Sequence, residues 1–433
     1  LSYLPIGSFF YSISPKRLSM ALGRTHSLMP SPSISLGLIA VSLGLITLIG
    51  PASIDMYLPF IPAMAQELGT DYAAMQLTLA VFLVALGAGQ LICGPLIDAY
   101  GRRRPLLTAL FVFALASLGA AYAYNLPVLL LARAVQGLAA SLVLVTAMST
   151  VRDVTEGADA AKLFAMLMTI QGVGPVLAPA AGGLIGSAFG WRGVFIALAM
   201  LGCMATINSA IHLKETLPPA ARSSLRPGEV LRTYAAIMQD QRFVLAGLTL
   251  SAAFVFIFVY VGGAAYVYQT HYGLSPRDFG FVFGGTGIAV FIGAAATAKL
   301  VARFRTEQLA IAGLTCLAVG ALVGLVSALT AIGLPGIIAG FFIALAGVGM
   351  AEAMLMSMAL SLRSTALGAS AALLGAVPLL LGAAITPVAA IAAKHNAATW
   401  LGLIFAVGVI AVALSVRTAR MIVQSGVTVS HAH

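Results

Sequence analysis

The sequence has very little charge. Only 8% of its 433 residues are Asp, Glu, Lys or Arg, whereas 61% are hydrophobic. Soluble domains carry about 25% charged residues, so a soluble globular protein is excluded. Apolar segments recur from about residue 37 to residue 417 and leave no room for a sizeable soluble domain. The composition therefore predicts an integral membrane protein.

Cysteine is scarce, and the common catalytic motifs are missing. The three cysteines, Cys93, Cys203 and Cys316, lie in apolar segments without a CxxC or histidine partner, so we expect neither a disulfide framework nor a metal site. The sequence has no Walker A run, GxSxG, HExxH or dinucleotide fingerprint. We therefore expect a carrier that uses no cofactor and is driven by an ion gradient rather than by nucleotide hydrolysis.

Positive charge exceeds negative charge, with 23 basic and 13 acidic residues. The basic residues lie in short links between apolar runs, which argues against nucleic-acid binding and indicates orientation in a membrane. Nineteen of them lie in every second link and in the two tails, all of which fall on one side of the membrane. Three, Arg192, Arg277 and Lys394, fall on the other side, and Arg133 lies within a span. The positive-inside rule then places both termini in the cytoplasm.

Spanning helices need about 20 mostly apolar residues, and twelve segments meet this requirement. They cover residues 37–59, 74–97, 105–123, 126–150, 162–188, 192–212, 243–268, 279–299, 309–329, 334–358, 367–391 and 397–416. The longest polar link divides them six and six. We thus expect an all-α membrane protein of two pseudo-symmetric six-helix bundles with a site between them. The parts are a cytoplasmic tail 1–36, bundles 37–212 and 243–416, a cytoplasmic linker 213–242 and a tail 417–433. Met20 and Met29 are candidate starts, which would make part of 1–36 an upstream stretch.

Three stretches carry recognisable patterns. The charged link "GPLIDAYGRRRPLL" holds Gly94, Asp98, Gly101, Arg102 and Arg103. The run "LARAVQGLAAS" holds Arg133, Gln136 and Gly137. The run "QGVGPVLAPAAGGLIG" holds Gly172, Gly174, Pro175, Pro179, Gly182 and Gly183.

These stretches resemble the signatures of the major facilitator superfamily. The runs "IDMYLPFIPAMAQELGT", "MQLTLAVFLVALGAGQL" and "STVRDV" look specifically like those of drug:proton antiporters of the bicyclomycin and chloramphenicol resistance type. The first stretch is similar to the loop signature between helices 2 and 3, except that Ala99 replaces the usual basic residue. The third stretch is similar to the antiporter signature of helix 5. The resemblance extends over all twelve spans. It implies the major facilitator fold, export rather than uptake, and a link between the helix 4 arginine and proton coupling.

Three ionisable residues, Asp55, Arg133 and Glu352, lie within the predicted spans. A charge at mid-bilayer costs at least about 2.5 kcal/mol, so such residues normally face a cavity or a partner. We expect Asp55 to carry the proton and Arg133 to act as its electrostatic partner. The alternatives are a solvated or capping Asp55 near the outer surface and a structural Arg133 bonded to backbone carbonyls. Glu352 is either a second protonation site or drug contact, or a solvated residue near the inner helix end.

Neighbouring side chains are candidates for substrate binding. Tyr57 and Gln136 share a helix with a buried charge, and Phe258 and Tyr266 belong to the aromatic helix 7. We expect the small-residue run of helix 5 to pack closely against helix 8 and to form a bendable contact between the bundles. Close packing without a hinge is the alternative.

The link 94–107 is expected to act as a conformational gate. Its arginines hold it on the inner side, and Gly94 and Gly101 would permit close approach and a sharp turn. Asp98 would pair with a loop arginine and face a helix N-terminus of the other bundle, forming a latch in the outward-facing state.

The sequence thus favours a proton-coupled exporter of multiple drugs, or of phenicol- or bicyclomycin-like compounds, located as a monomer in a bacterial inner membrane. Its partners would be a small amphipathic drug, protons and lipid. The alternative carrier is a proton-coupled uptake system for a small metabolite, although anionic metabolites usually require more than one buried cation. A membrane enzyme or sensor is disfavoured, because neither clustered catalytic residues nor a soluble domain is present.

Overall fold

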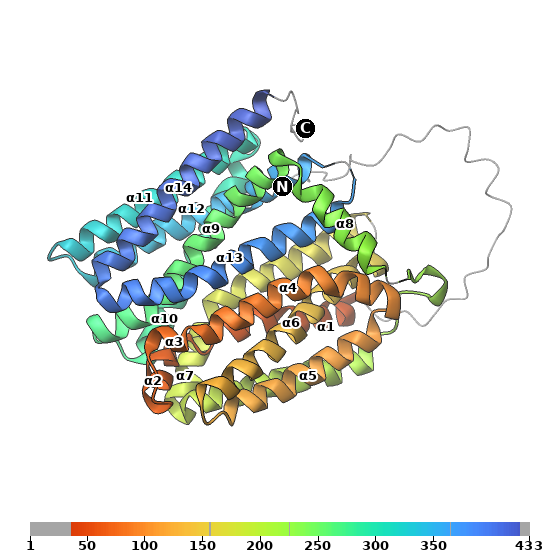
Figure 1. The fold of residues 1–433 in the computed structure, drawn as a ribbon, viewed down its shortest axis with the longest axis horizontal. Helices are drawn as coiled ribbons and strands as arrows, with labels where there is room; N and C mark the ends of the chain where they lie inside the picture. The colour runs from red at the N-terminus through yellow and green to blue at the C-terminus, as the bar shows by residue number, and fades with distance from the viewer. Residues whose placement is uncertain (1–35, 156, 225, 364, 425–433) are drawn as a thin grey trace.

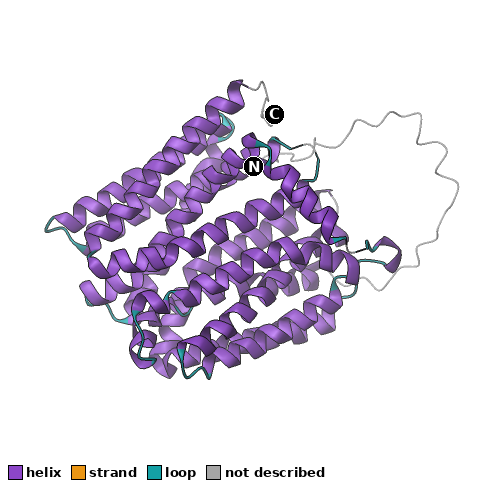
Figure 2. Cartoon of the chain, viewed as in Figure 1, coloured by secondary structure: helices purple, strands orange, loops and turns teal. Residues whose placement is uncertain are grey.

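The computed structural model describes residues 36–155, 157–224, 226–363 and 365–424 of the chain. Within these ranges the secondary structure consists of helices joined by short turns (Figure 2). The expected tails lie largely outside the described residues, which begin at 36 and end at 424.

The spanning helices follow one another along the chain, with short elements between some of them. The first bundle contains α1 (Leu36–Asp55), η2 (Leu58–Phe60), α2 (Ile61–Glu67), α3 (Tyr72–Met75), α4 (Leu77–Tyr100), α5 (Arg103–Ala121), α6 (Leu126–Val154) and α7 (Gly157–His212). The linker contains η3 (Pro219–Ala221) and α8 (Pro227–Met238). The second bundle contains α9 (Gln241–Tyr266), η4 (Val267–His271), α10 (Pro276–Leu300), α11 (Thr306–Leu329), α12 (Leu334–Ser361), α13 (Leu367–His395) and α14 (Ala397–Gln424).

The prediction of twelve spans is confirmed once α7 is divided. In the described part of the chain, 11 helices are long and apolar enough to cross a membrane. One of them is α7, which breaks at Gly190, where φ is 71° and ψ is 176°. A positive φ suits glycine, so the chain turns there without the strain that a Cβ would cause. The helix before Gly190 and the helix after it are the fifth and sixth spans.

The spans form two bundles (Figure 1). The red-to-yellow helices of the first half and the green-to-blue helices of the second half occupy opposite parts of the molecule. Among the described residues, the most extensive contacts between the bundles are those of α4 with α13 and of α7 with α10. The part of α7 before Gly190 is the fifth span and α10 is the eighth, so the expected contact of helix 5 with helix 8 is confirmed. Gly280 of α10 lies against the Pro179 carbonyl and Gly284 lies against the Val176 carbonyl.

Two boundaries differ from the sequence-based prediction. α14 continues past residue 416 to Gln424, so Arg417 and Arg420 belong to a helix and not to the expected tail. The linker contains the amphipathic helix α8, which is too short and too polar to register as a span. Its Tyr234 hydroxyl donates to the Leu91 carbonyl of α4 over 3.0 Å. We use "inner end" for the side of α8 and "outer end" for the opposite side, following the predicted orientation.

Glycines allow the closest helix contacts in the second bundle. On α11 and α12, Gly320 lies against the backbone of Gly340 and Ala344, and Gly313 lies against Gly347 and Ala351. Lipid supplies no hydrophobic force between helices, so such small-residue contacts hold a membrane bundle together through van der Waals packing. A Cβ at these positions would overlap backbone atoms, which cannot move aside as a side chain can.

Gly320→Ala should therefore destabilise the protein, by about 1–3 kcal/mol for an overpacked contact. Gly402→Ala on α14 is the matched control, because a Cβ there meets open space. Thermal unfolding of the purified variants in detergent measures the difference. Equal midpoints for the two variants would contradict the packing described.

Candidate functional site

Asp55 stands where the first span breaks. α1 ends at Asp55 and the chain resumes a helical course at Leu58 in η2, still inside the continuous span Gly37–Glu67. The Asp55 residue is only 5% exposed. Among the described residues, no donor forms a hydrogen bond or ion pair with its carboxyl group. The structure therefore holds a nearly buried carboxyl group without a fixed partner.

Arg133 of α6 lies in the core of the first bundle and is fully buried. Its Nε donates to the Thr78 carbonyl over 3.2 Å, and one Nη donates to the Ser53 carbonyl over 3.0 Å. The other Nη donates to Oε1 of Gln136. The guanidinium carbon lies 4.6 Å from the ring centre of Tyr57 and 4.3 Å from that of Phe82. Carbonyl oxygens and aromatic faces thus surround the cation.

The described ion pairs do not join Arg133 to Asp55, and the electrostatic partnership of the two residues stays a prediction. Arg133 instead holds the backbone of helix 1 at Ser53, two residues before Asp55. This geometry agrees with the alternative of a structural arginine bonded to backbone carbonyls. The arginine can act on Asp55 through the position of helix 1 as well as through its charge.

Two predicted substrate contacts lie in the same core. Gln136 is fully buried, and its Nε2 donates to the Ser117 hydroxyl over 2.8 Å. Tyr57 is also fully buried, and its hydroxyl lies 3.2 Å from that of Thr78. Their polar atoms contact protein, so a role in substrate binding does not fit where the structure places them. Gln136 shares α6 with the buried Arg133 as expected, whereas Tyr57 lies in the break between α1 and η2, and both side chains point into the bundle core.

The second bundle repeats this arrangement without the charge. Tyr260 takes the place of Tyr57, and its hydroxyl lies 3.1 Å from that of Thr286. Phe341 of α12 stacks on the Tyr260 ring with centroids 4.0 Å apart. α6 and α12 both begin with a Leu-Pro pair. Arg133 and Phe341 follow that pair by the same number of residues. The pseudo-symmetry of the fold is therefore broken at this position, where only the first bundle holds an arginine.

Glycines of the helix 5 motif shape helix 1 around Asp55. Gly174 packs on Pro51, and Gly182 packs on the Met56 backbone at the break that follows Asp55. Gly183 approaches the Pro276–Arg277 backbone of the second bundle, and Gly172 faces Phe291 there. Pro175 and Pro179 lie within a continuous helix, because Gly190 is the described residue of α7 that leaves helical geometry. The motif therefore joins the Asp55 break to the interface between the bundles.

The gate loop is tied to the inner ends of the first bundle. The Arg102 side chain donates to Asp98 over 2.6 Å and to Asp153 of α6 over 2.9 Å. Arg103 donates to the carbonyls of Leu213 and Ala210, both over 2.8 Å. The loop thus clamps α4, α6 and the end of α7 to one another.

Glu215 of the linker accepts from the Arg102 backbone N–H over 2.8 Å and also from the N–H of Arg103. These groups form the start of α5, so the carboxylate caps that helix. Partial burial raises the pKa of Glu215, but the N–H groups of Arg102, Leu217 and Arg103 outweigh it and hold the pKa below its ordinary value. The cap therefore stays charged at neutral pH.

Two details of the predicted gate differ from the structure. Gly101 ends α4 with φ at 92° and makes the expected sharp turn, but a Cβ on Gly94 would meet open space. The predicted close approach at Gly94 is therefore wrong for this conformation. The Asp98 side chain bonds to Arg102, and in the described part of the chain it has no partner in the second bundle. The latch of the outward-facing state remains a prediction.

The outer ends of the bundles are joined by a group of polar contacts that we call the outer seal. The Tyr72 hydroxyl and Nε2 of Gln76 both donate to the Gly262 carbonyl over 3.0 Å. Lys394 pairs with Asp71. Gln269 donates to the Pro59 carbonyl over 2.8 Å. Within the described residues, these are the side-chain hydrogen bonds that connect the two bundles, so the carrier is tied at its outer end.

The ion pair of the outer seal is insensitive to mild acid. The hydrogen bond from Lys394 holds the pKa of Asp71 below its ordinary value. A lowered carboxyl pKa means that the pair is intact above the ordinary value of about 3.9 and is lost only as the pH falls through the lowered one. A proton gradient near neutral pH therefore does not protonate Asp71 or break this ion pair.

The remaining candidates lie apart from Asp55. Phe258 is buried against Gly382 of α13, which assigns it to helix packing rather than to an open cavity. Tyr266 is half-buried at the outer seal, where its ring centre lies 4.9 Å from that of Tyr72. Glu352 is half-buried within the span Leu334–Ser361 and has no described hydrogen bond. The structure brings together Asp55, Tyr57, Arg133 and Gln136 but not these three.

Sequence reasoning missed several members of the site. Thr78 and Phe82 complete the arginine pocket, Asp153 and Glu215 complete the gate, and Gln76 is central to the outer seal. The run "STVRDV" contains the acidic residue Asp153, and that residue was the sequence signal for an ion pair with the loop arginines. The backbone acceptors have no sequence signal.

Comparisons with known proteins agree with this architecture. The family model of the Major Facilitator Superfamily matches residues 43–377. The chain is 40% identical over 257 residues to the uncharacterized MFS-type transporter YdgK of Bacillus subtilis (strain 168), covering 59% of this chain and 64% of that protein. It is 30% identical to a chloramphenicol resistance protein of Pseudomonas aeruginosa, covering 73% of this chain and 74% of that protein. It is 32% identical to the multidrug resistance protein MdtL of Escherichia coli (strain K12 / DH10B), covering 49% and 54%.

Solved structures support the fold. A bacterial homolog of the human lysosomal transporter Spinster, in an inward-facing and occupied conformation, matches with a TM-score of 0.71 at 16% identity, covering 91% of this chain and 99% of that one. A D-xylose-proton symporter matches with a TM-score of 0.70 at 14% identity, covering 88% and 97%. Such low identities bear on the fold alone. With the family model matching most of the chain, the protein belongs to the major facilitator superfamily of membrane transporters.

Proposed function

We propose that the protein is a proton-coupled efflux antiporter for small amphipathic drugs, with Asp55 as the proton carrier. The observation that carries the proposal is the Asp55 carboxyl group, which is 5% exposed, has no described partner and stands at the break of helix 1. A carboxyl group in a dry site favours the protonated form and gives up its proton when water or a competing ligand enters.

The direction of transport is supported by two further points. The helix 5 run with Gly182 and Gly183 resembles the antiporter signature, and it contacts both the Asp55 break and the second bundle. A relative named chloramphenicol resistance protein matches 73% of the chain, and one named multidrug resistance protein matches 49%. We infer that the protein exports small amphipathic drugs across a bacterial inner membrane and that both of its termini are cytoplasmic.

In the proposed cycle, proton entry drives drug export. With the outer seal closed, drug enters from the inner side and Asp55 releases its proton inward. After the bundles rock and the seal opens, drug leaves and Asp55 takes a proton from outside. Arg133 acts as a positioning residue, because it fixes the helix 1 backbone at Ser53 and adds a constant positive charge to the first bundle.

Asp55→Asn should abolish drug-dependent proton movement. In inverted vesicles with an acid interior, adding chloramphenicol should release protons from vesicles that carry the natural chain and not from those with the variant. The amide keeps the size of the side chain but cannot take up a proton.

Asp159→Asn supplies the control, since Asp159 is exposed at the start of α7 and pairs only with Lys162. Drug uptake that persists after the proton gradient is collapsed would refute proton coupling. Growth of a deletion strain on candidate nutrients, if impaired, would instead favour an uptake carrier.

Arg133→Lys separates bonding geometry from charge. A lysine keeps the positive charge but cannot donate in a planar fork to the Ser53 carbonyl, the Thr78 carbonyl and Gln136 together. Loss of one charged hydrogen bond is worth about 1.5–3 kcal/mol, so transport should fall by about tenfold or more.

Arg104→Lys is the matched control, because the exposed Arg104 side chain has no described partner. Uptake of labelled drug into the inverted vesicles is the measurement. Full activity of the Arg133→Lys variant would show that charge alone suffices and would contradict the positioning role.

Asp98→Asn should slow transport by up to about fivefold, because an ion pair with a half-exposed carboxylate is worth at most about 1 kcal/mol, while drug affinity stays nearly unchanged. The amide weakens the contact with Arg102 and removes the charge needed for the outward-facing latch. Equilibrium binding to purified protein, measured beside vesicle transport, distinguishes the two effects. A large loss of affinity would place Asp98 at the substrate and overturn the gate assignment.

A further inference from the structure

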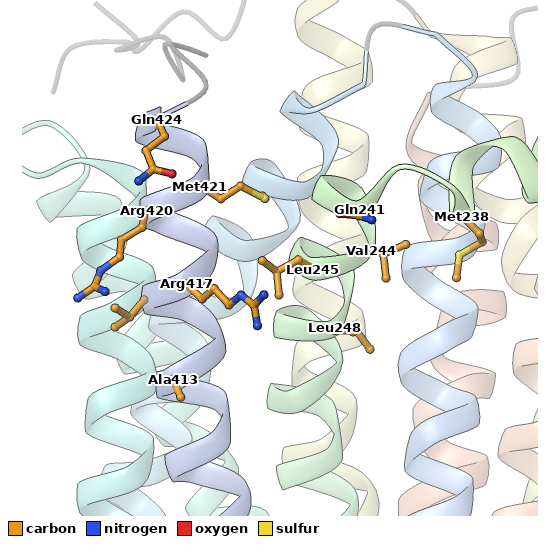
Figure 3. A pocket seen from close by; sticks show the side chains of 11 residues that line it. Met238, Gln241, Val244, Leu245, Leu248, Ala413, Arg417, Arg420, Met421 and Gln424 are labelled. Carbon is orange, nitrogen blue, oxygen red and sulfur yellow. The ribbon is translucent and has the colours of Figure 1, made fainter.

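A cavity of about 760 Å³ opens between the inner ends of α9 and α14, away from Asp55 and Arg133. Its walls are mostly apolar and include Val244, Leu245 and Leu248 of α9 and Ala413 of α14. Two glutamines, Gln241 and Gln424, lie at the inner mouth, and Arg417 and Arg420 complete the lining (Figure 3). The cavity thus has a polar mouth and an apolar interior.

Arg417 is the charged group of this cavity. Figure 3 shows its side chain extending from α14 toward α9, whereas the Arg420 side chain extends from the other flank of α14. Both residues are exposed and lie within the membrane span Ala397–Ile422. Neither guanidinium has a described hydrogen bond or ion pair. A cation at membrane depth without a protein partner calls for an anion from its surroundings.

Among the described residues, the protein provides no free carboxylate that could pair with Arg417. No aspartate or glutamate follows Glu352 in the sequence, so α13 and α14 contain none. On the helices packed against α14, the acids nearest the inner end are Asp240 before α9 and Glu307 in α11. Asp240 already pairs with Arg363 at 3.4 Å and Glu307 with Arg305 at 3.4 Å. The positive charge of Arg417 is therefore left for a ligand.

We propose that this cavity binds one anionic phospholipid of the inner leaflet, with the phosphate on Arg417 and the acyl chains along the apolar wall of α9 and α14. The inner mouth lies where headgroups lie in the predicted orientation, and cytoplasmic leaflets carry the anionic lipids. Arg420 stands on the rim and contributes a second, weaker attraction. The cavity lies within the second bundle and next to Met238 at the end of α8, so the bound lipid would contact both the bundle and the linker helix.

The test uses the purified full chain in neutral detergent with dioleoylphosphatidylglycerol as the probe. Native mass spectrometry over a lipid concentration series gives the affinity of the tightest lipid. Arg417→Gln should weaken that affinity by about fivefold, the factor equivalent to about 1 kcal/mol for one basic residue at an anionic surface. Arg420→Gln should weaken it less, and Arg417→Lys should retain most of it.

Arg303→Gln is the matched control, because Arg303 is an exposed inner-end arginine outside the cavity and its side chain has no described partner. Ala413→Trp tests the apolar part, since it fills the cavity without changing the charge, and it should also weaken binding. Every variant must elute as a single species, which keeps misfolding separate from lost affinity.

Five results would overturn the proposal. Arg417→Gln could lose no more affinity than Arg303→Gln, or Ala413→Trp could lose none, and either result would indicate diffuse electrostatics. Equal affinity for dioleoylphosphatidylcholine would show that no anion is recognised. Equal affinity for soluble glycerol 3-phosphate would indicate a site for a free phosphate. A dimer that excludes the lipid would assign the cavity to a second copy of the chain.

Discussion

The cost of placing charge in a low-dielectric interior governs this molecule. Few charged residues lie inside the spans, and two of them, Arg133 and Asp55, have opposite surroundings. Arg133 is satisfied by two backbone carbonyls, one amide and two aromatic rings, so its charge is fixed. Asp55 is nearly buried and has no described partner, and the proposed function assigns the exchangeable proton to it. The fixed cation holds the backbone of helix 1 at Ser53, two residues before the carboxyl group.

Comparison of the two pseudo-symmetric bundles shows that the first one carries the buried arginine and the second one does not. Tyr57 and Thr78 in the first bundle have counterparts in Tyr260 and Thr286 in the second, with the same contact between hydroxyl groups. Where the first bundle places Arg133 over the tyrosine, the second places Phe341. The second bundle therefore has an apolar aromatic core at this level. The glycines of helix 5 connect the two bundles by contacting helix 1 on one side and α10 on the other.

The fold follows from the sequence because hydropathy alone sets the spans and the basic links set their orientation. The break at Gly190 falls between the two predicted spans 162–188 and 192–212. The end of α14 was missed because Arg417 and Arg420 resemble the start of a tail, and α8 was missed because a surface helix has no continuous apolar run. Both elements line the cavity that sequence reasoning did not anticipate.

The site was predicted only in part. Asp55 and Arg133 stand out because ionisable residues are rare in apolar spans, but spacing along a helix does not tell which neighbour a face meets. Gln136 shares the face of Arg133, and that face points into the bundle, where Ser117 and the arginine occupy its amide. The acceptors at Ser53 and Thr78 are backbone atoms, which any residue supplies.

The central claim is that the proton exchanged for substrate resides on Asp55. Its most direct test is the number of protons released when chloramphenicol is added to the purified carrier in weakly buffered detergent solution near neutral pH. The account predicts release from the natural chain and none from the Asp55→Asn variant, with drug binding retained in both. Equal release from the two proteins would place the proton on another group and contradict the account.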